Sequence, residues 1–201
     1  CEPEGLAHSF DVVHGASVCA IGLAVDDVPG ALARADALRI PRFEQAIAPD
    51  EWPIPSVRGV GGSLLYFVDG ASRDAMWAHE FPHPLEPQPP AHLSGIDHVA
   101  QTMQFEEFLS WLLFYVALLD VRKTPQLEIA DPMGLVQSQA VEAPGGAVRF
   151  TLNGSLASQS LSSRFIQNYF GAGVQHIALA CPDIFAAAFR HDAPELLQQP
   201  E

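Results

Sequence analysis

Two histidines stand inside short apolar runs that have the composition of β-strands. His98 lies in Ile96-Asp97-His98-Val99, and His176 lies in Val174-Gln175-His176-Ile177. The interior of a strand is a costly place for an imidazole unless a hydrogen bond or a metal ion satisfies it. Two inward-pointing imidazoles could share a divalent metal, and a carboxylate would then complete the facial triad of a non-haem Fe(II) site.

Spacing alone leaves a simpler alternative open for this pair. Each imidazole could merely form a hydrogen bond with a backbone carbonyl, and two histidines 78 residues apart are a weak signal for a metal site. On spacing alone the simpler alternative is favoured.

Composition excludes several classes of partner. The chain has 201 residues with 24 acidic and 10 basic side chains, which give a formal charge of -14. Such a chain repels nucleic-acid phosphates, and its single lysine, Lys123, offers no basic patch for a membrane surface. The longest mostly apolar run, 108–119, is too short to span a bilayer. We therefore expect neither a nucleic-acid nor a membrane partner.

The three cysteines, Cys1, Cys19 and Cys181, form no CxxC motif. Their odd number and their spacing favour free thiols in a reducing compartment. We therefore expect a cytoplasmic protein.

Hydrophobic periodicity predicts an alternation of strands and helices. Val28 to Leu38 has a helical period behind Asp27, a residue that can cap a helix, and Phe105 to Leu119 is apolar nearly all round. In the second of these helices the pattern places Phe105, Phe108, Leu109, Leu112 and Val116 on one side, and because the helix is apolar nearly all round we expect it to pack on two surfaces. A polar-led helix is expected within 155–170, and a further helix is expected to begin at 183–191. The predicted strands are 17–25, 63–69, 95–102, 124–129, 135–142, 147–153 and 173–180.

Two segments of the chain resemble each other at an offset of 156 residues. Val18, Ile21, Leu23, Ala24, Asp27 and Ala31 recur as Val174, Ile177, Leu179, Ala180, Asp183 and Ala187. Shared strand-then-helix patterning could produce such an echo, but a duplicated unit accounts for it better. His176 matches Ala20, so the first copy lacks the imidazole. Five prolines between 81 and 90 indicate an extended linker between two modules.

Several motifs resemble the catalytic module of the 4-hydroxyphenylpyruvate dioxygenase family, which belongs to the vicinal oxygen chelate superfamily. These motifs are Gly95-Ile96-Asp97-His98-Val99-Ala100-Gln101-Thr102-Met103, Gly134-Leu135-Val136-Gln137-Ser138, Arg149-Phe150-Thr151-Leu152-Asn153 and Gly171-Ala172-Gly173-Val174-Gln175-His176-Ile177-Ala178. Other stretches are more similar to the dioxygenase-like C-terminal domain of bacterial two-domain 3-dehydroshikimate dehydratases, which carry a barrel domain upstream. Those stretches are 14–22, 58–64, 108–115 and 131–136.

This resemblance covers nearly the whole chain and implies its architecture. It implies an α+β fold of paired βαβββ units, the vicinal oxygen chelate fold, incomplete at both ends. Residues 1–80 would be the second half of a non-catalytic module and 81–94 the proline-rich linker. Residues 95–201 would be a metal-binding module truncated before its last strands, and a barrel domain would precede it in the parent chain.

The resemblance also implies a ligand set. His98 and His176 correspond to the first two metal ligands of the family, while Ser138, Asn153 and Gln175 correspond to polar groups that face a 2-oxo acid. Hydroxyls and amides can orient a carboxylate or a phenol without competing for the metal. The implied cofactor is a divalent metal, with Fe(II) the first expectation and Mg, Mn or Co as alternatives.

Two departures from the family weaken the case for a working dioxygenase. The third ligand of the family, a Glu, is absent from this chain, because Glu195 and Glu201 come too early to match it. Leu161 occupies a position where the dioxygenases carry a Gln that faces the substrate. Losing that polar contact would weaken hydroxyphenylpyruvate binding by on the order of 1–3 kcal/mol.

Three functions remain open on this reading. The first expectation is a metal-binding domain of a dehydratase that converts 3-dehydroshikimate to protocatechuate, with this fragment inactive alone. The alternatives are an Fe(II)-dependent dioxygenase acting on hydroxyphenylpyruvate or a related aromatic acid, and a non-enzymatic module that binds a small acid. In each case the expected ligand is a small aromatic or cyclic carboxylic acid, and association into a homo-oligomer is left open.

Overall fold

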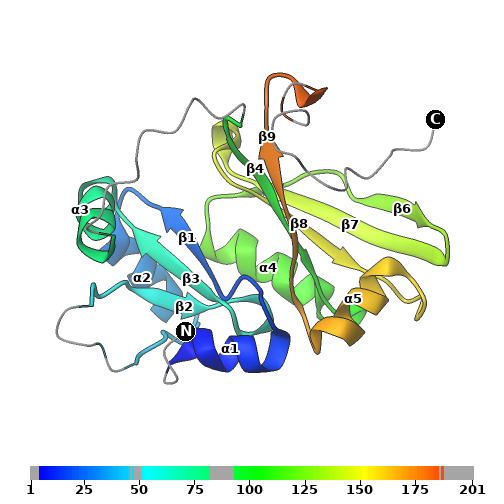
Figure 1. The fold of residues 1–201 in the computed structure, drawn as a ribbon, viewed down its shortest axis with the longest axis horizontal. Coiled ribbons are helices and arrows are strands. Elements are labelled where there is room, and N and C mark those ends of the chain that lie inside the picture. The colour runs from blue at the N-terminus through cyan, green and yellow to red at the C-terminus, as the bar shows by residue number, and fades with distance from the viewer. Residues whose placement is uncertain (1–4, 46, 48–50, 82–92, 186, 188–201) are drawn as a thin grey trace.

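Two mixed β-sheets organise the fold in the computed structural model, which describes residues 5–45, 47, 51–81, 93–185 and 187 (Figure 1). The N-terminal part, residues 5–81, holds one sheet, and the C-terminal part, residues 93–187, holds the other. The N-terminal elements are α1 Leu6–His14, β1 Ala20–Ala24, α2 Val28–Ala37, β2 Ser56–Arg58, the 3-10 turn Val60–Gly62, β3 Leu64–Val68 and α3 Gly70–Glu80. The C-terminal elements are β4 Gly95–Thr102, the 3-10 turn Phe105–Glu107, α4 Phe108–Leu118, β5 Arg122–Lys123, β6 Leu127–Asp131, β7 Gly134–Glu142, the 3-10 turn Pro144–Gly146, β8 Arg149–Gly154, α5 Leu161–Tyr169 and β9 Gly173–Ala180.

The N-terminal sheet has the order β1-β3-β2, with β1 parallel and β2 antiparallel to β3. Ile21 lies opposite Leu65 and Leu23 opposite Phe67, so one face of the sheet is apolar. Helix α2 packs on that face. It begins where the sequence predicts, because the Asp27 side chain accepts a hydrogen bond from the Gly30 amide at 2.9 Å.

The C-terminal sheet has the order β5-β7-β8-β4-β9, with β6 paired to β7. Its first strand, β4, is parallel to β8 and antiparallel to β9. In both sheets the first strand is followed by a helix, and the last strand of the unit pairs in parallel with the first. The parallel pair is β4 with β8 here and β1 with β3 in the N-terminal sheet. The repeated strand–helix–strands pattern expected from the sequence is therefore present, and the fold is mixed α+β.

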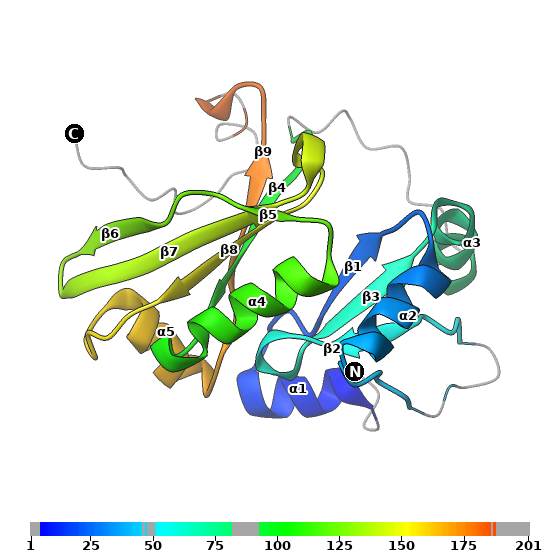
Figure 2. The same ribbon diagram turned by 180° about the vertical axis from the view of Figure 1, so that it is seen from behind.

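Helix α4 contributes several large side chains to a core shared by both parts. Phe108, Leu112 and Tyr115 point inward, and the Tyr115 ring stacks on Phe150 with centroids 4.5 Å apart. Figure 2 shows α2 and α4 in front of their respective sheets. The same buried cluster includes Leu65 and Phe67 of the N-terminal sheet, so the two parts do not have separate cores.

One sequence prediction for α4 is wrong. The pattern grouped Leu109 with Phe108 and Leu112 in a helix expected to pack on two surfaces, but Leu109 is 69% exposed and Leu113 is 68% exposed. The buried stripe runs through Phe108, Leu112 and Tyr115 instead. A helix that is apolar nearly all round carries no clear phase in its sequence, so periodicity cannot tell which side faces the core.

The other predicted elements are observed at nearly the predicted positions, but α1, α3 and the short strands β2 and β5 were not predicted. Only Phe10 is buried in α1, and no residue is buried in α3, so the core does not require an apolar stripe in either helix. The linker predicted at 81–94 and the helix predicted from 183 lie for the most part outside the described residues. None of the helices in the described ranges has the length and apolarity needed to cross a lipid bilayer.

Besides the shared core and a hydrogen bond from Arg34 Nε to the Ala117 carbonyl oxygen, two contacts hold the N-terminal part against the C-terminal part. At the first, the His14 ring stacks on Tyr169 with centroids 4.4 Å apart, and His14 Nδ1 lies 2.6 Å from the Tyr169 carbonyl oxygen. At the second, Gly61 in the 3-10 turn lies against the backbone of Ala172. A Cβ atom built on Gly61 would lie 1.9 Å from the Ala172 carbonyl oxygen, so only glycine fits this approach.

We predict that Gly61→Ala destabilises the fold, whereas the neighbouring Gly62→Ala does so much less. Both glycines have positive φ, 63° and 81°, so both substitutions share the conformational penalty of an L residue. Only at Gly61 does the new methyl group meet backbone, since nothing lies within 4 Å at Gly62. We expect a difference of about 1–3 kcal/mol in the free energy of urea unfolding. Equal destabilisation by the two substitutions would contradict this tight contact.

Candidate metal centre

His98 and His176 face each other across the pair of strands β4 and β9. Their ring centroids are 5.5 Å apart, and the rings meet edge to face with an interplanar angle of 78°. In the antiparallel register, Ala100 pairs with His176 and His98 pairs with Ala178. The two imidazoles are thus diagonal neighbours on one face of the sheet, although 78 residues separate them along the chain.

A break in the strand register accompanies each histidine. The pairing of β4 with β9 shifts between Ile96 and His98, which leaves Asp97 as the extra residue of β4. It shifts again between Ala100 and Gln101, where Gln175 is the extra residue of β9. Bulges of this kind bend a strand and re-aim its side chains. They place a polar residue, Asp97 or Gln175, directly before each imidazole.

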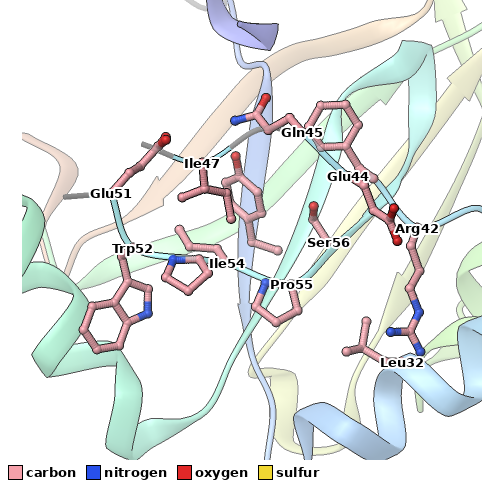
Figure 3. A pocket seen from close by; sticks show the side chains of 13 residues that line it. Leu32, Arg42, Glu44, Gln45, Ile47, Glu51, Trp52, Ile54, Pro55 and Ser56 are labelled. Atoms are coloured by element: carbon pink, nitrogen blue, oxygen red, sulfur yellow. The ribbon is translucent and has the colours of Figure 1, made fainter. Parts of the chain in front are cut away.

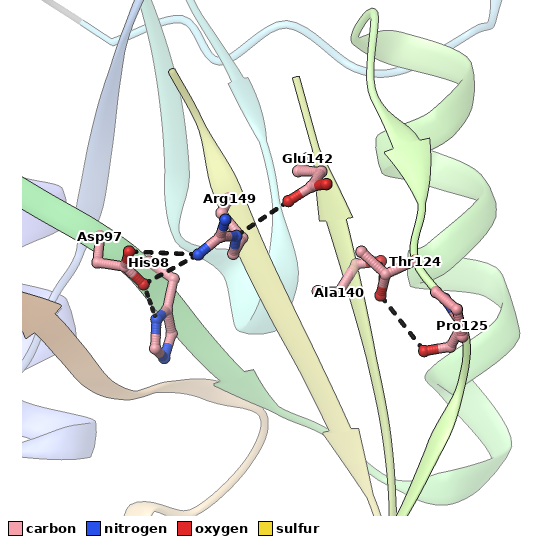
Figure 4. A network of polar contacts seen from close by, with 7 residues as sticks. All are labelled: Asp97, His98, Thr124, Pro125, Ala140, Glu142 and Arg149. Carbon is pink, nitrogen blue, oxygen red and sulfur yellow. Dashed lines mark hydrogen bonds and ion pairs between the residues drawn. The ribbon is translucent and has the colours of Figure 1, made fainter. Parts of the chain in front are cut away.

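A chain of ion pairs orients the His98 ring (Figure 4). His98 Nδ1 lies 2.7 Å from Asp97 Oδ2. Arg149 Nη1 donates to both Asp97 oxygens at 3.1 and 3.2 Å, and Arg149 Nε donates to Glu142 Oε2 at 3.1 Å. The His98 hydrogen bond, together with the Arg149 charge, lowers the pKa of Asp97 below its ordinary value. Asp97 is therefore ionised at neutral pH and can only accept hydrogen bonds.

This network sets which His98 nitrogen is free to bind a ligand. Because the Asp97 carboxylate can only accept, Nδ1 of His98 must carry the proton that lies between them. In the neutral ring the lone pair is then on Nε2. A carboxylate that fixes the tautomer of an imidazole in this way is the usual outer partner of a metal-binding histidine.

His176 lies in an environment that keeps it uncharged. Partial burial, with His98 nearby, lowers the pKa of His176 from its ordinary value. A neutral imidazole is the form that binds a metal ion. The pair can therefore present two imidazole nitrogens as metal donors on one face of a sheet.

The polar residues predicted to face a substrate fall on the same face, one step further along the strands. Ser138 pairs with Asn153 across β7 and β8, and both side chains are buried. The adjacent row runs from Ala140 through Thr151 and Ala100 to His176. Side chains two residues apart along a strand share a face, so Ser138 and Asn153 lie on the histidine face. Gln175 is half-buried at the bulge beside His176.

Sequence reasoning missed Thr102, which extends this row onto β4. Thr102 pairs with Asn153, is fully buried, and its Oγ1 has no hydrogen-bond partner within the described part of the chain. A buried hydroxyl without a partner is uncommon and indicates a place for a water molecule or a ligand atom. The sequence signal was present, since Thr102 lies in the same strand as His98 at an even spacing.

The described residues do not complete a metal site by themselves. No group of three His, Cys, Asp or Glu side chains that could hold a metal ion occurs among them. The pair His98 and His176 can therefore supply two donors, and further donors would have to come from other residues, a substrate or water. Leu161, which departs from the family, is the first residue of α5 and is 61% exposed.

A separate pocket of about 350 Å³ lies in the N-terminal part (Figure 3). Trp52, Ile54 and Tyr66 line it together with Glu44 and Glu51. All its lining residues precede position 67, so neither His98 nor His176 takes part in it.

The chain is similar to known proteins over most of its length. Residues 1–81 match the family model described as hydroxyphenylpyruvate dioxygenase, N-terminal. Over 187 residues the chain is 39% identical to a 3-dehydroshikimate dehydratase of Pseudomonas aeruginosa. The aligned region covers 92% of this chain and 30% of the dehydratase. The chain is 31% identical to a 4-hydroxyphenylpyruvate dioxygenase of the same species, covering 92% of this chain and 52% of that protein.

Solved structures give the same picture. A xylose isomerase-like TIM barrel/4-hydroxyphenylpyruvate dioxygenase fusion protein superposes with a TM-score of 0.73 at 34% identity, covering 94% of this chain and 29% of that chain. A 4-hydroxymandelate synthase variant from Streptomyces coelicolor superposes with a TM-score of 0.74 at 20% identity, covering 93% of this chain and 56% of that chain, which shows the fold alone.

The paired strand–helix–strands units and these matches define the vicinal oxygen chelate fold. Within this fold, the chain is similar to 4-hydroxyphenylpyruvate dioxygenases and to 3-dehydroshikimate dehydratases. The chain spans 30% of the length of the dehydratases it matches.

We predict that His176 titrates below the ordinary histidine range and that His98→Ala raises its pKa. The substitution opens the His176 ring to water and removes the neighbouring imidazole of His98, and both changes favour the protonated form of His176. Because the pKa is lowered in the folded state, the contribution of His176 to stability falls as pH decreases below about 6.5. Imidazole NMR signals followed against pH measure this. An unchanged His176 pKa in the variant would show that the two rings do not interact.

Proposed function

We propose that this chain is the dioxygenase-like domain of a longer 3-dehydroshikimate dehydratase, and that it binds a divalent metal ion through His98 and His176. The observation that carries the proposal is the share of each relative's length that this chain covers. The chain covers 30% of the dehydratase of Pseudomonas aeruginosa and 29% of the barrel–dioxygenase fusion structure, at 39% and 34% identity. A barrel domain upstream in the parent chain accounts for both proportions.

The proposed domain organisation follows from the repeated sheets. Residues 1–80 would form half of a non-catalytic module, 81–94 the linker, and 95–201 the metal-binding module. The common order of strands in the two sheets supports this division. In the N-terminal sheet Ala20 stands at the position that matches His176, so the first module lacks that histidine.

The donor set fits a divalent metal. His98 would bind through Nε2, because Asp97 holds Nδ1, and His176 would bind as a neutral imidazole. Fe(II), the first choice for two imidazoles and a carboxylate, would when bound supply open coordination positions for a 2-oxo acid and dioxygen. Mg, Mn or Co remain alternatives, because two imidazoles alone do not select one metal.

The chain's own residues would hold a small aromatic or cyclic carboxylic acid beside the metal. Ser138, Asn153 and Gln175 offer hydroxyl and amide groups on the histidine face, and Thr102 adds a buried hydroxyl without a partner. These groups can orient hydroxyl or carboxyl oxygens of the ligand without carrying charge. The buried strands below them would exclude water from that side of the ligand.

A second candidate function is an Fe(II)-dependent dioxygenase acting on hydroxyphenylpyruvate or a related acid. The histidine pair beside a row of polar side chains is the observation that favours it. The identity to a dioxygenase, 31%, is lower than the 39% identity to a dehydratase, so we place it second.

The deciding experiment uses the polypeptide that carries this chain. Supplied with 3-dehydroshikimate and a divalent metal, it is expected to form protocatechuate, measured by absorbance. Iron-dependent oxygen uptake with hydroxyphenylpyruvate, abolished in His176→Ala, together with no protocatechuate, would instead establish the dioxygenase. If the polypeptide shows neither activity, both assignments are contradicted.

We also predict that Asp97→Ala weakens metal binding without unfolding the domain. Loss of the carboxylate leaves His98 free to rotate and to change its tautomer, which in metal sites costs about 10- to 100-fold in affinity. Calorimetric titration with Co(II) measures the effect. Asp74→Ala is the matched control, because Asp74 is exposed on α3 and pairs only with Arg73. Equal affinity in the two variants would show that Asp97 does not support a metal ligand.

A further inference from the structure

A groove of about 620 Å³ lies between the N-terminal and C-terminal parts, away from the histidine pair. One wall is the loop after α2 and the glycine turn at 59–62, and the other wall is α4 with its preceding turn. The floor is Gly171 and Ala172. On β8, Phe150 and Leu152 belong to the core that α4 fills, whereas Asn153 lies on the histidine face. The groove and the histidines are therefore on opposite sides of the sheet.

An arginine on the first wall occupies a position that normally belongs to glycine. Helix α2 ends in a turn in which the Arg39 amide donates to Asp36 O and the Ile40 amide donates to Ala35 O, both at 2.9 Å. This is the Schellman pattern, whose left-handed residue is usually glycine. Arg39 has φ of 58°, which an L residue adopts only at a cost. Such a cost is characteristic of positions kept for function.

Arg39 is available to a ligand. Its side chain forms no hydrogen bond or ion pair within the described residues, although it lines the groove. A second arginine, Arg58, is held nearby, with its guanidinium 4.7 Å above the Phe43 ring and Nη1 donating to Gly62 O at 3.3 Å. Two of the ten basic residues of an acidic chain thus line one groove.

The remaining lining limits the chemistry of the ligand. Trp111 and Phe114, in edge-to-face contact with centroids 5.2 Å apart, give the second wall an aromatic surface. Gln104 adds an amide, and Glu107 is the single carboxylate in the lining. Guanidinium groups pair with carboxylates in a planar, two-point geometry, and aromatic rings stack on indole.

We propose that this groove binds a small planar carboxylate, such as an aromatic acid, between Arg39 and Arg58 with its ring against Trp111. The volume suits a ligand of that size. The excess of two positive charges over one negative charge attracts the carboxylate, and the aromatic wall selects a flat body. The site is distinct from the histidine face and does not depend on the proposed metal.

The test uses benzoate as the probe and the indole N–H signal of Trp111 as the reporter. The signal is assigned in the 1H–15N spectrum by its loss in Trp111→Phe. Because Trp111 lies on the side opposite His98 and His176, its shift reports the groove and not the histidine face. Benzoate is expected to shift it in a saturable manner, and neutral benzamide is expected to shift it far less.

Removing a positive charge and removing a negative charge from the groove should change benzoate affinity in opposite directions. Arg39→Gly removes an attractive charge and is expected to weaken benzoate binding by about fivefold. Glu107→Gln removes a repulsive charge and is expected to strengthen benzoate binding. Arg39→Gly also places glycine at a left-handed position, so its melting temperature is expected to be no lower. Arg122→Gln, on β5 outside the groove, is the control and should bind as wild type.

Three results would each overturn the proposal. The first is no shift of the Trp111 signal with benzoate up to about 10 mM, the range of very weak ligands. The second is equal binding of benzamide, which would remove the role of the carboxylate. The third is wild-type affinity in a folded Arg39→Gly variant, which would remove the role of the guanidinium.

Discussion

The antiparallel pairing of β4 with β9 is the constraint on which the candidate site depends. It joins residues 95–102 to residues 173–180 and brings two imidazoles to a centroid separation of 5.5 Å. Side chains alternate along a strand, so a shift of the register by one residue would turn one histidine into the opposite layer. The two bulges act within this constraint. Each inserts one polar residue before a histidine, and at Asp97 that residue becomes the hydrogen-bond partner of the ring.

Electrostatics reinforce the same geometry. In a chain of charge -14, a carboxylate is surrounded by other negative groups, and Arg149 is the cation that links Asp97 to Glu142. These groups are partly exposed, so the contribution of each ion pair to overall stability is small. Their role is to orient side chains, because Arg149 holds the Asp97 carboxylate in place and the carboxylate orients the His98 ring. On the partner strand, partial burial of His176, with His98 nearby, lowers the pKa of the His176 imidazole.

Much of the fold could be predicted from the sequence, and the limits have physical causes. Strands such as 95–102 and 173–180 combine β-branched residues with clear boundaries, and the cap at Asp27 identifies the start of α2. The buried side of α4 could not be predicted, because an apolar residue occupies almost every position and tertiary packing alone selects the stripe. His98 and His176 could be named as candidates, but their proximity depends on a pairing between distant segments. Asp97 and Thr102 gain their roles only from that pairing, and Arg39 only from a left-handed turn that its sequence does not announce.

The histidine pair lies on two adjacent strands, and among the 70 residues between these strands it is β7 and β8 that supply Glu142 and Arg149 to orient the His98 ring. The turn at Pro144–Gly146 and the segment 155–160 lie outside the strands β4 and β9. Insertions or deletions there change the outline of the domain without changing which face the imidazoles occupy. A single-residue insertion within β4 or β9 would have to be absorbed as another bulge. Lineages that carry this domain can therefore diversify the loops between the strands while the two imidazoles stay in place, so gaps in an alignment of relatives should collect in the loops.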